Sequence, residues 1–185
     1  FRRVLFRSAR NRFVVFSQNH DQIGNRLMGD RLSRLVSFEK LKLAAAAVIL
    51  SPYIPLLFMG EEYGETAPFP YFISHSDSFF IESVRQGRKE EFAEFLRKGE
   101  PMDPQDESSF ECAKLNQALR EENQHARLYK FYRELLKFRK TLAAVTSYFT
   151  DGGMVMDWEE ERLIVLSISS PGKQFLILLH FEIGR

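Results

Sequence analysis

The sequence predicts an α/β protein followed by a small antiparallel β-region, and three observations carry that prediction. Residues 13–16 and 54–59 are two short apolar runs, which are typical of buried strands in a parallel sheet. A stretch with helical spacing separates the two runs, and a polar loop follows each of them. This order predicts a βαβ unit, in which the two strands are parallel and the crossover is right-handed.

The elements of the βαβ unit have recognisable ends. The strand over 13–16 ends in a polar cluster, and we expect residues 17–30 to form a polar loop. The helix begins after Ser37, an N-cap residue with Glu39 in the first turn, and stops before Pro52. Because α/β proteins build their sites at the carboxyl ends of parallel strands, the loops after both strands are the candidate functional regions.

The rest of the chain alternates loops and helices before its period changes. Residues 60–78 form a long loop rich in glycine, proline and aromatic residues, a length that usually has a function. We expect a charged helix over 79–98, an acidic loop over 99–113, and a helix with an apolar stripe over 123–142. Strands at 154–158, 162–168 and 174–181 predict an antiparallel meander.

Composition and charge exclude several classes of protein. With 44% hydrophobic and 28% charged residues the chain is neither disordered nor collagen-like, and its longest apolar run, 43–50, is too short to cross a bilayer. All 25 acidic residues follow residue 12, against 21 of the 26 basic ones, and an acidic body argues against a nucleic-acid partner. Residues 1–12 are a basic arm or, as we favour, a non-native basic leader.

Other motifs are weak or missing. A single cysteine, Cys112, forms no internal disulfide, and the sequence shows no signal peptide pattern, so we expect a cytoplasmic protein. It contains no zinc, nucleotide-binding or serine-triad motif, so we expect no metal and no cofactor.

The segment 18–26, QNHDQIGNR, contains the most informative polar cluster. Asp21, flanked by His20, amide side chains and Arg26, can stay ionised and point at a hydroxyl-rich ligand. Alternatively, Asp21 accepts hydrogen bonds from backbone amides and pairs with Arg26 in a structural loop. On these residues alone, this structural alternative is favoured. The acids of the segment 60–65, Glu61 among them, have similar alternatives: they line a pocket, or they lie in a solvated turn.

The first strand with Asn19-His20-Asp21 resembles the fourth signature region of the α-amylase family of glycoside hydrolases. Longer matches at 18–26, 51–65 and 103–107 narrow the resemblance, which covers about residues 13–180, to the branch of that family that releases trehalose. The resemblance implies that 13–143 are the C-terminal part of a catalytic (β/α)8 TIM barrel, with its last two strands and helices, and that 144–185 begin a C-terminal β-domain. The chain would then be a fragment, inactive and poorly stable alone, with the nucleophile and the acid/base preceding Phe1.

The resemblance also implies roles for particular residues. Asp21 would be the catalytic carboxylate that stabilises the transition state, and His20 would bind the sugar. Asn19, Gln22 and Arg26 would bind substrate or shape the loop. The implied reaction is retaining hydrolysis of the α-1,4 bond next to the terminal trehalose of a malto-oligosyltrehalose, without a cofactor. The alternatives are an α-glucan branching enzyme, a non-catalytic glucan-binding module, and a nucleic-acid binder that uses the N-terminal arginines.

Overall fold

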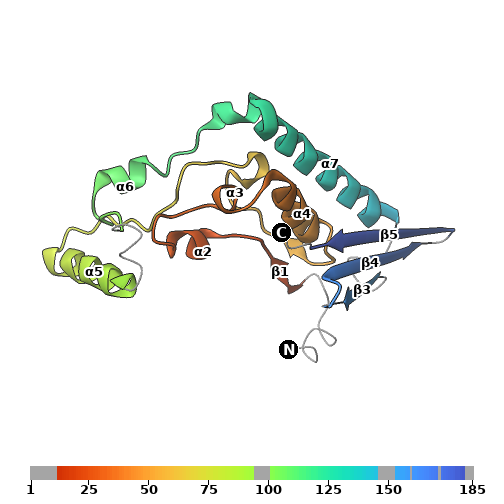
Figure 1. Cartoon of the computed structure of the whole chain (residues 1–185), viewed down its shortest axis with the longest axis horizontal. Coiled ribbons are helices and arrows are strands. Elements are labelled where there is room, and N and C mark those ends of the chain that lie inside the picture. Colours follow the sequence, from red (N-terminus) through yellow and green to blue (C-terminus); the bar gives the residue numbers. More distant parts are fainter. Residues whose placement is uncertain (1–11, 94–100, 146–152, 159, 171, 182–185) are drawn as a thin grey trace. The chain divides into compact units, whose positions relative to one another are not determined.

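The computed structural model describes residues 12–93, 101–145, 153–158, 160–170 and 172–181 (Figure 1). The chain divides into two compact units. The first unit comprises residues 1–17, 38–57 and 127–185, and the second unit comprises 18–37 and 58–126. Apart from Arg12, the predicted leader lies outside the described residues. No helix in the described ranges combines the length and the apolar character that a membrane span requires.

The parallel strand pair predicted from the sequence is confirmed in the first unit. β1 (Val14–Val15) pairs in parallel with β2 (Ile54–Pro55), and α4 (Phe38–Ile49) lies between them in the chain. Both strands are shorter than predicted. The prediction that they are buried on both faces is wrong: Val14 is 51% and Ile54 44% exposed. Within the described residues β1 and β2 form a sheet of two strands, so each has a neighbour on one side only.

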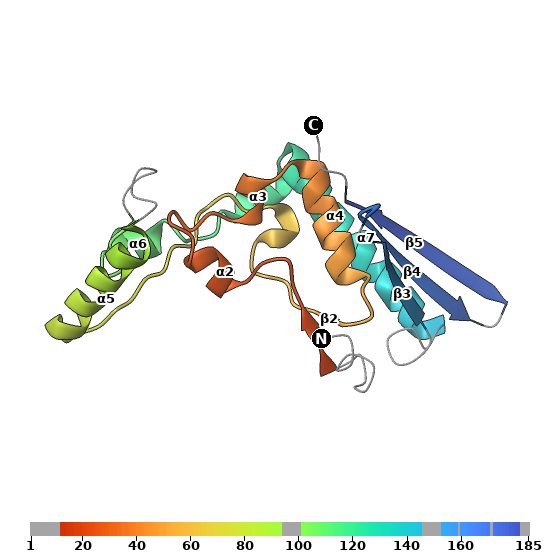
Figure 2. The same ribbon diagram turned by 60° about the horizontal axis from the view of Figure 1, so that its bottom comes forward.

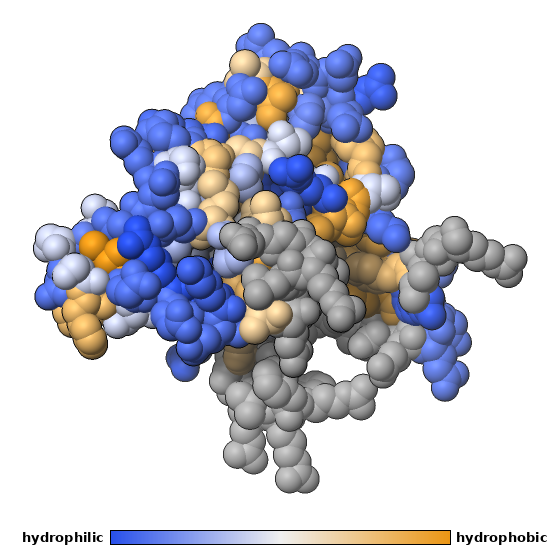
Figure 3. Space-filling view, turned by 60° about the vertical axis from the view of Figure 1, so that its left-hand side comes forward, coloured by the Kyte–Doolittle hydropathy of each residue, from blue (hydrophilic) through white to orange (hydrophobic). Residues whose placement is uncertain are grey.

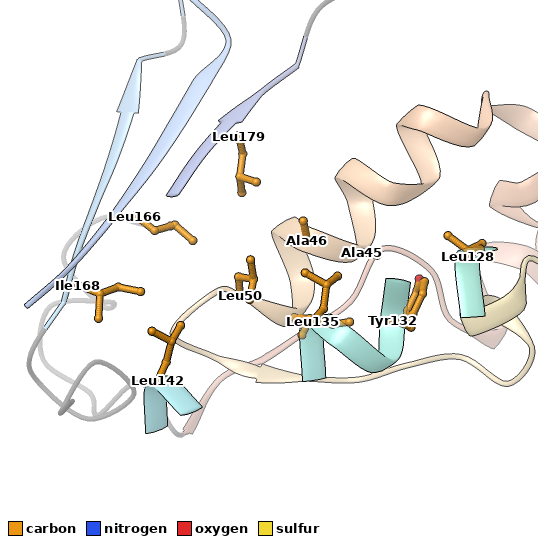
Figure 4. Close-up of a cluster of buried hydrophobic side chains, with 11 residues drawn as sticks. Ala45, Ala46, Leu50, Leu128, Tyr132, Leu135, Leu142, Leu166, Ile168 and Leu179 are labelled. Carbon is orange, nitrogen blue, oxygen red and sulfur yellow. The ribbon is translucent and has the colours of Figure 1, made fainter. Parts of the chain in front are cut away.

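The core of the first unit joins two helices and a three-stranded sheet (Figure 4). α7 (Asn123–Val145) presents the predicted apolar stripe, and its basic residues at 127, 130, 133 and 137 are exposed. The small side chains of Ala45 and Ala46 on α4 are part of this core. The buried cluster is completed by side chains of α4, of the residue that follows it, of α7 and of the sheet: Ile49, Leu50, Leu128, Tyr132, Leu135, Leu142, Leu166, Ile168 and Leu179.

The predicted antiparallel meander is also confirmed. β3 (Gly153–Trp158) pairs with β4 (Leu163–Ser170), and β4 pairs with β5 (Lys173–His180), both antiparallel. On β5 the side chain of Leu179 enters the core while its neighbour Leu178 is 58% exposed, as expected for alternating faces. Figure 2 shows the sheet beside α7 and α4.

The second unit consists of short helices joined by loops. Its elements are α2 (His20–Gly24), α3 (Leu32–Leu35), η2 (Glu61–Tyr63), α5 (Ser78–Glu91), α6 (Glu107–Glu111) and η4 (Gln117–Glu121). Two predicted loops are therefore wrong in part, because 17–30 contains α2 and 99–113 contains α6. Each of these helices begins at a capping side chain, Asn19 or Asp106, which accepts an amide of the first turn. α5 ends at Glu91 rather than at 98, and residues 94–100 lie outside the description.

Candidate active site

The predicted site residues lie on and around α2, in the second unit. His20 and Asp21 form its first turn, and their side chains are each 71% exposed. His20 Nε2 lies 3.3 Å from Asp21 Oδ1, so the structure brings these two groups together at the surface. Gln22 and Arg26 are exposed too. Asn19 has a structural task, because its Oδ1 accepts the amide of Gln22 at 2.9 Å.

The alternative that makes Asp21 a structural acid does not fit this geometry. In the part of the chain that is described, the carboxylate of Asp21 pairs with His20 and not with Arg26. The capping bond at the start of α2 is accepted by Asn19. An exposed carboxylate beside one imidazole keeps oxygen lone pairs that can accept hydrogen bonds from a ligand.

Buried polar side chains fix the chain before and after α2. Gln18, which is 6% exposed, accepts the amide of Leu32 at 3.0 Å and reaches Glu61 Oε2 at 3.5 Å. Arg31, only 1% exposed, donates to the carbonyls of Met59 and Ala67, each at 2.7 Å. The segment that contains α2 is thus anchored on the loop 58–67 through charge-assisted and neutral hydrogen bonds.

Arg31 is held in an aromatic and acidic environment. Its guanidinium lies 5.0 Å from the ring centroid of Phe58 and 6.0 Å from that of Phe69. Burial lowers the pKa of Arg31, and the nearby carboxylate of Glu65 opposes that shift. Nothing in the local sequence distinguished Arg31 from the exposed arginines around it, so sequence reasoning missed this anchor.

The acids of the loop after β2 also have structural tasks. Glu61 is 5% exposed and accepts the amide of Phe58 at 3.0 Å. Glu65 is 1% exposed and accepts four hydrogen bonds, from the amides of Thr66, Ala67 and Asn116 and from the hydroxyl of Tyr63. Glu61 and Glu65 therefore do not lie in a solvated turn, because both are buried and accept hydrogen bonds from the surrounding chain. Glu62 is partly exposed and pairs with Arg120 at 3.8 Å.

A local signal for this inward turn was present in the sequence. Gly60 and Gly64 flank η2 with φ angles of 88° and 72°, a backbone region that glycine adopts readily. A Cβ at Gly60 would lie 2.7 Å from the Cβ of Glu65, so the turn closes tightly on that side chain. Burial raises the pKa of Tyr63, and its hydrogen bond to Glu65 adds to the shift, so this hydroxyl remains a donor.

Comparison with known proteins finds relatives that share one name. No protein-family model matches the chain. A malto-oligosyltrehalose trehalohydrolase of Saccharolobus solfataricus is 47% identical over 129 residues, which are 70% of this chain and 21% of that protein. One of Mycobacterium tuberculosis is 40% identical over 156 residues, 84% of this chain and 27% of that protein. This chain is a relative of the malto-oligosyltrehalose trehalohydrolases. It spans about a quarter of the length of these curated relatives.

One solved structure supports the resemblance to the α-amylase family. A crystal structure from Salmonella typhimurium, named as an alpha amylase, superposes with a TM-score of 0.80 at 37% identity and covers 95% of this chain and 30% of that one. A trehalulose synthase variant, MutB D200A with glucose, superposes with a TM-score of 0.51 at 21% identity and shows the fold alone. The predicted α/β class and the resemblance to the α-amylase family are confirmed.

Proposed function

We propose that this chain supplies the transition-state-stabilising carboxylate, Asp21, to a retaining glycoside hydrolase that releases trehalose from malto-oligosyltrehalose. One observation carries the proposal: Asp21 is 71% exposed with His20 beside it, whereas Glu61 and Glu65 are buried and occupied by loop donors. Of these three acids, Asp21 is the one that a substrate can reach. The relatives at 40–47% identity bear the name of that activity.

The proposed chemistry gives Asp21 an electrostatic role. In retaining hydrolysis one carboxylate attacks the anomeric carbon and a second protonates the leaving oxygen, through an oxocarbenium-like transition state. An ionised Asp21 near the ring would stabilise the positive charge that develops there and accept hydrogen bonds from sugar hydroxyls. The ring of His20 would hydrogen-bond the same sugar. In this proposal attack and protonation belong to other carboxylates of the parent enzyme.

The proposal extends to the architecture of the first unit. We place β1, α4 and β2 as the last two strands of a (β/α)8 barrel with the helix between them, and β3–β5 as the start of a C-terminal β-domain. The parallel pairing of β1 with β2 and the antiparallel meander support this placement. So does the TM-score of 0.80 with the Salmonella structure. The loops after both strands would then lie on the face where such barrels build their sites.

The test is the Asp21→Asn variant of the full-length enzyme that contains this segment. The substitution keeps the shape of the side chain and removes its charge, so kcat for trehalose release should fall about 10²–10³-fold while KM changes little. Asp30→Asn is the matched control, because Asp30 lies in the same segment and its ion pair among the described residues is with Arg34, at 3.7 Å. An unchanged kcat for Asp21→Asn would remove Asp21 from the mechanism.

The products separate the alternatives. Trehalose as the product supports the proposal, whereas a branched glucan points to a branching enzyme. Maltodextrin binding without turnover, unaffected by Asp21→Asn, points to a glucan-binding module.

A further inference from the structure

We propose that Arg88 of α5 is a positioning residue that fixes the C-terminal end of α2 and thereby the direction of Asp21. The inference rests on the proposed function, because it assigns Arg88 to the same site. All of the groups involved lie in the second unit.

Arg88 holds α2 by two polar contacts. Its Nη2 donates to the carbonyl of Gly24, the last residue of α2, at 2.8 Å, and its Nη1 donates to Asn25 Oδ1 at 3.2 Å. The carbonyls at the end of a helix have no partner within it, so an arginine satisfies one of them here. Sixty-four positions separate Arg88 from Gly24 in the chain, so this contact is purely tertiary.

The guanidinium of Arg88 is itself fixed. Its side chain is 12% exposed, and its Nη1 lies 2.8 Å from Glu91 Oε2. The guanidinium carbon lies 4.6 Å from the ring centroid of Phe92 and 5.2 Å from that of Tyr71. A planar cation held by two rings and a carboxylate has few alternative rotamers, so it can impose a position on the groups that it binds.

The end of α2 is also held by packing. Ile23 is 2% exposed and Gly24 is buried. A Cβ at Gly24 would lie 3.8 Å from the carbonyl oxygen of Phe69 and 3.9 Å from the amide nitrogen of Tyr71. The same segment that supplies the Tyr71 ring to Arg88 therefore lies against the backbone of Gly24.

The contact of Arg88 with Asn25 affects Asp21 because the two residues are joined by a hydrogen bond across one helical turn. The carbonyl of Asp21 accepts the amide of Asn25 at 3.0 Å, and Asn25 is one of the two residues that Arg88 binds. At the other end, Asn19 caps the helix. Because α2 has only five residues, it depends on contacts at both ends to keep its geometry. A displaced turn would move the Asp21 carboxylate relative to the sugar, and a misplacement of about 1 Å can cost about 10²-fold in rate.

The test uses Arg88→Met in the full-length enzyme that contains this segment. Methionine keeps an apolar stem between the two rings and removes every donor. We expect kcat to fall about 10-fold or more with KM within about threefold, because alignment rather than binding is lost. Arg88→Lys, which keeps one donor for Gly24, should restore part of kcat. Lys89→Met is the matched control, since Lys89 is an exposed neighbour on the same helix, and it should leave kcat unchanged.

Hydrogen exchange gives a readout that does not depend on the activity. In Arg88→Met the amides of Asn25 and Arg26 should exchange about 10-fold faster, and in Lys89→Met they should not change. Adding Arg88→Met to Asp21→Asn should lower kcat little further, because both act through the same carboxylate. Unchanged exchange, or faster exchange with an unchanged kcat, overturns the positioning role of Arg88. A loss of activity in Arg88→Met that adds fully to that of Asp21→Asn overturns it as well. If Asp21→Asn keeps the kcat of the unmodified enzyme, the proposed function fails. The hydrogen exchange of the Asn25 and Arg26 amides then reports by itself whether Arg88 orders α2.

Discussion

Replacing Glu65 by glutamine should loosen the loop after β2. The change keeps the size of the side chain but turns one carboxylate oxygen into an NH2 group. In Glu65, Oε1 accepts the amides of Thr66 and Ala67 at 2.8 and 2.9 Å. The most favourable orientation of the new glutamine side chain places its carbonyl oxygen at the position of Oε1, so that these two hydrogen bonds are kept. The NH2 group then faces the amide of Asn116, which now donates to Oε2 at 2.7 Å.

The free-energy cost of Glu65→Gln follows from the four hydrogen bonds that Glu65 accepts. The hydroxyl of Tyr63 can turn and accept from the new NH2, but the amide of Asn116 loses its acceptor, which costs about 1–3 kcal/mol for a buried donor. The remaining bonds lose their charge assistance, roughly half of their strength. Relief of the buried charge offsets part of this loss. We therefore expect local opening to become easier by about 3 kcal/mol.

Hydrogen exchange at the amides of Ala67 and Asn116 measures this loss directly in the full-length protein. A cost of about 3 kcal/mol corresponds to exchange about 100-fold faster at these positions. Glu62→Gln is the control, because Glu62 makes a partly exposed ion pair with Arg120 at 3.8 Å, which is worth less than about 1 kcal/mol. Exchange in Glu65→Gln no faster than in Glu62→Gln would refute the assignment of Glu65 as the centre of the loop.

Three further predictions concern the second unit. Gly29→Ala places a Cβ 2.4 Å from the backbone nitrogen of Pro70 at a φ of +64°, so thermal melting should show a loss of about 2 kcal/mol or more. Gly87 lies within α5, and among the described residues no atom outside the adjacent helix backbone lies within 4 Å of a Cβ added there. Gly87→Ala should therefore stabilise the protein by about 0.5–1 kcal/mol, and equal melting temperatures of the two variants would contradict this reasoning. The guanidinium of Arg85 hydrogen-bonds Asp103 and lowers the pKa of that carboxyl. The ion pair therefore stabilises the fold fully at a pH above the ordinary pKa of aspartate, and this stabilisation is lost as the pH falls through the lowered pKa of Asp103. Arg85→Met should raise the pKa of Asp103 toward its ordinary value, and an unchanged midpoint in an NMR titration of that carboxyl would contradict the assignment.

Local signals predicted the elements of the first unit well. Ser37 before the apolar helix marked the start of α4, and the change of period after the helix over 123–142 predicted the three antiparallel strands. These features depend on neighbours in the chain, so the sequence carries them directly. The short helices α2 and α6 were missed although Asn19 and Asp106 are good capping residues, because five residues are too few to show helical spacing.

The exposed hydrophobic side chains show a limit of the sequence patterns. Phe79 and Phe80 stand at the start of α5, and they are 73% and 57% exposed. Figure 3 shows hydrophobic side chains at the surface among predominantly hydrophilic ones. An apolar residue in a charged helix says little about its burial until the neighbouring elements are placed.

The sequence by itself determined the α/β class, the parallel order of β1, α4 and β2, and the polar segment after β1 that contains Asp21. Only the tertiary structure decided which acids are buried. Asp21 and Glu65 both follow strands, in segments that the sequence predicted as polar loops. Glu65 is nevertheless buried, because Asn116, 51 positions later in the chain, brings an amide to it. Asp21 has no such donor among the described residues and lies exposed beside His20. The burial of a charge depends on partners that fold in from distant segments, and for that reason spacing along the chain did not separate a structural acid from a candidate catalytic one.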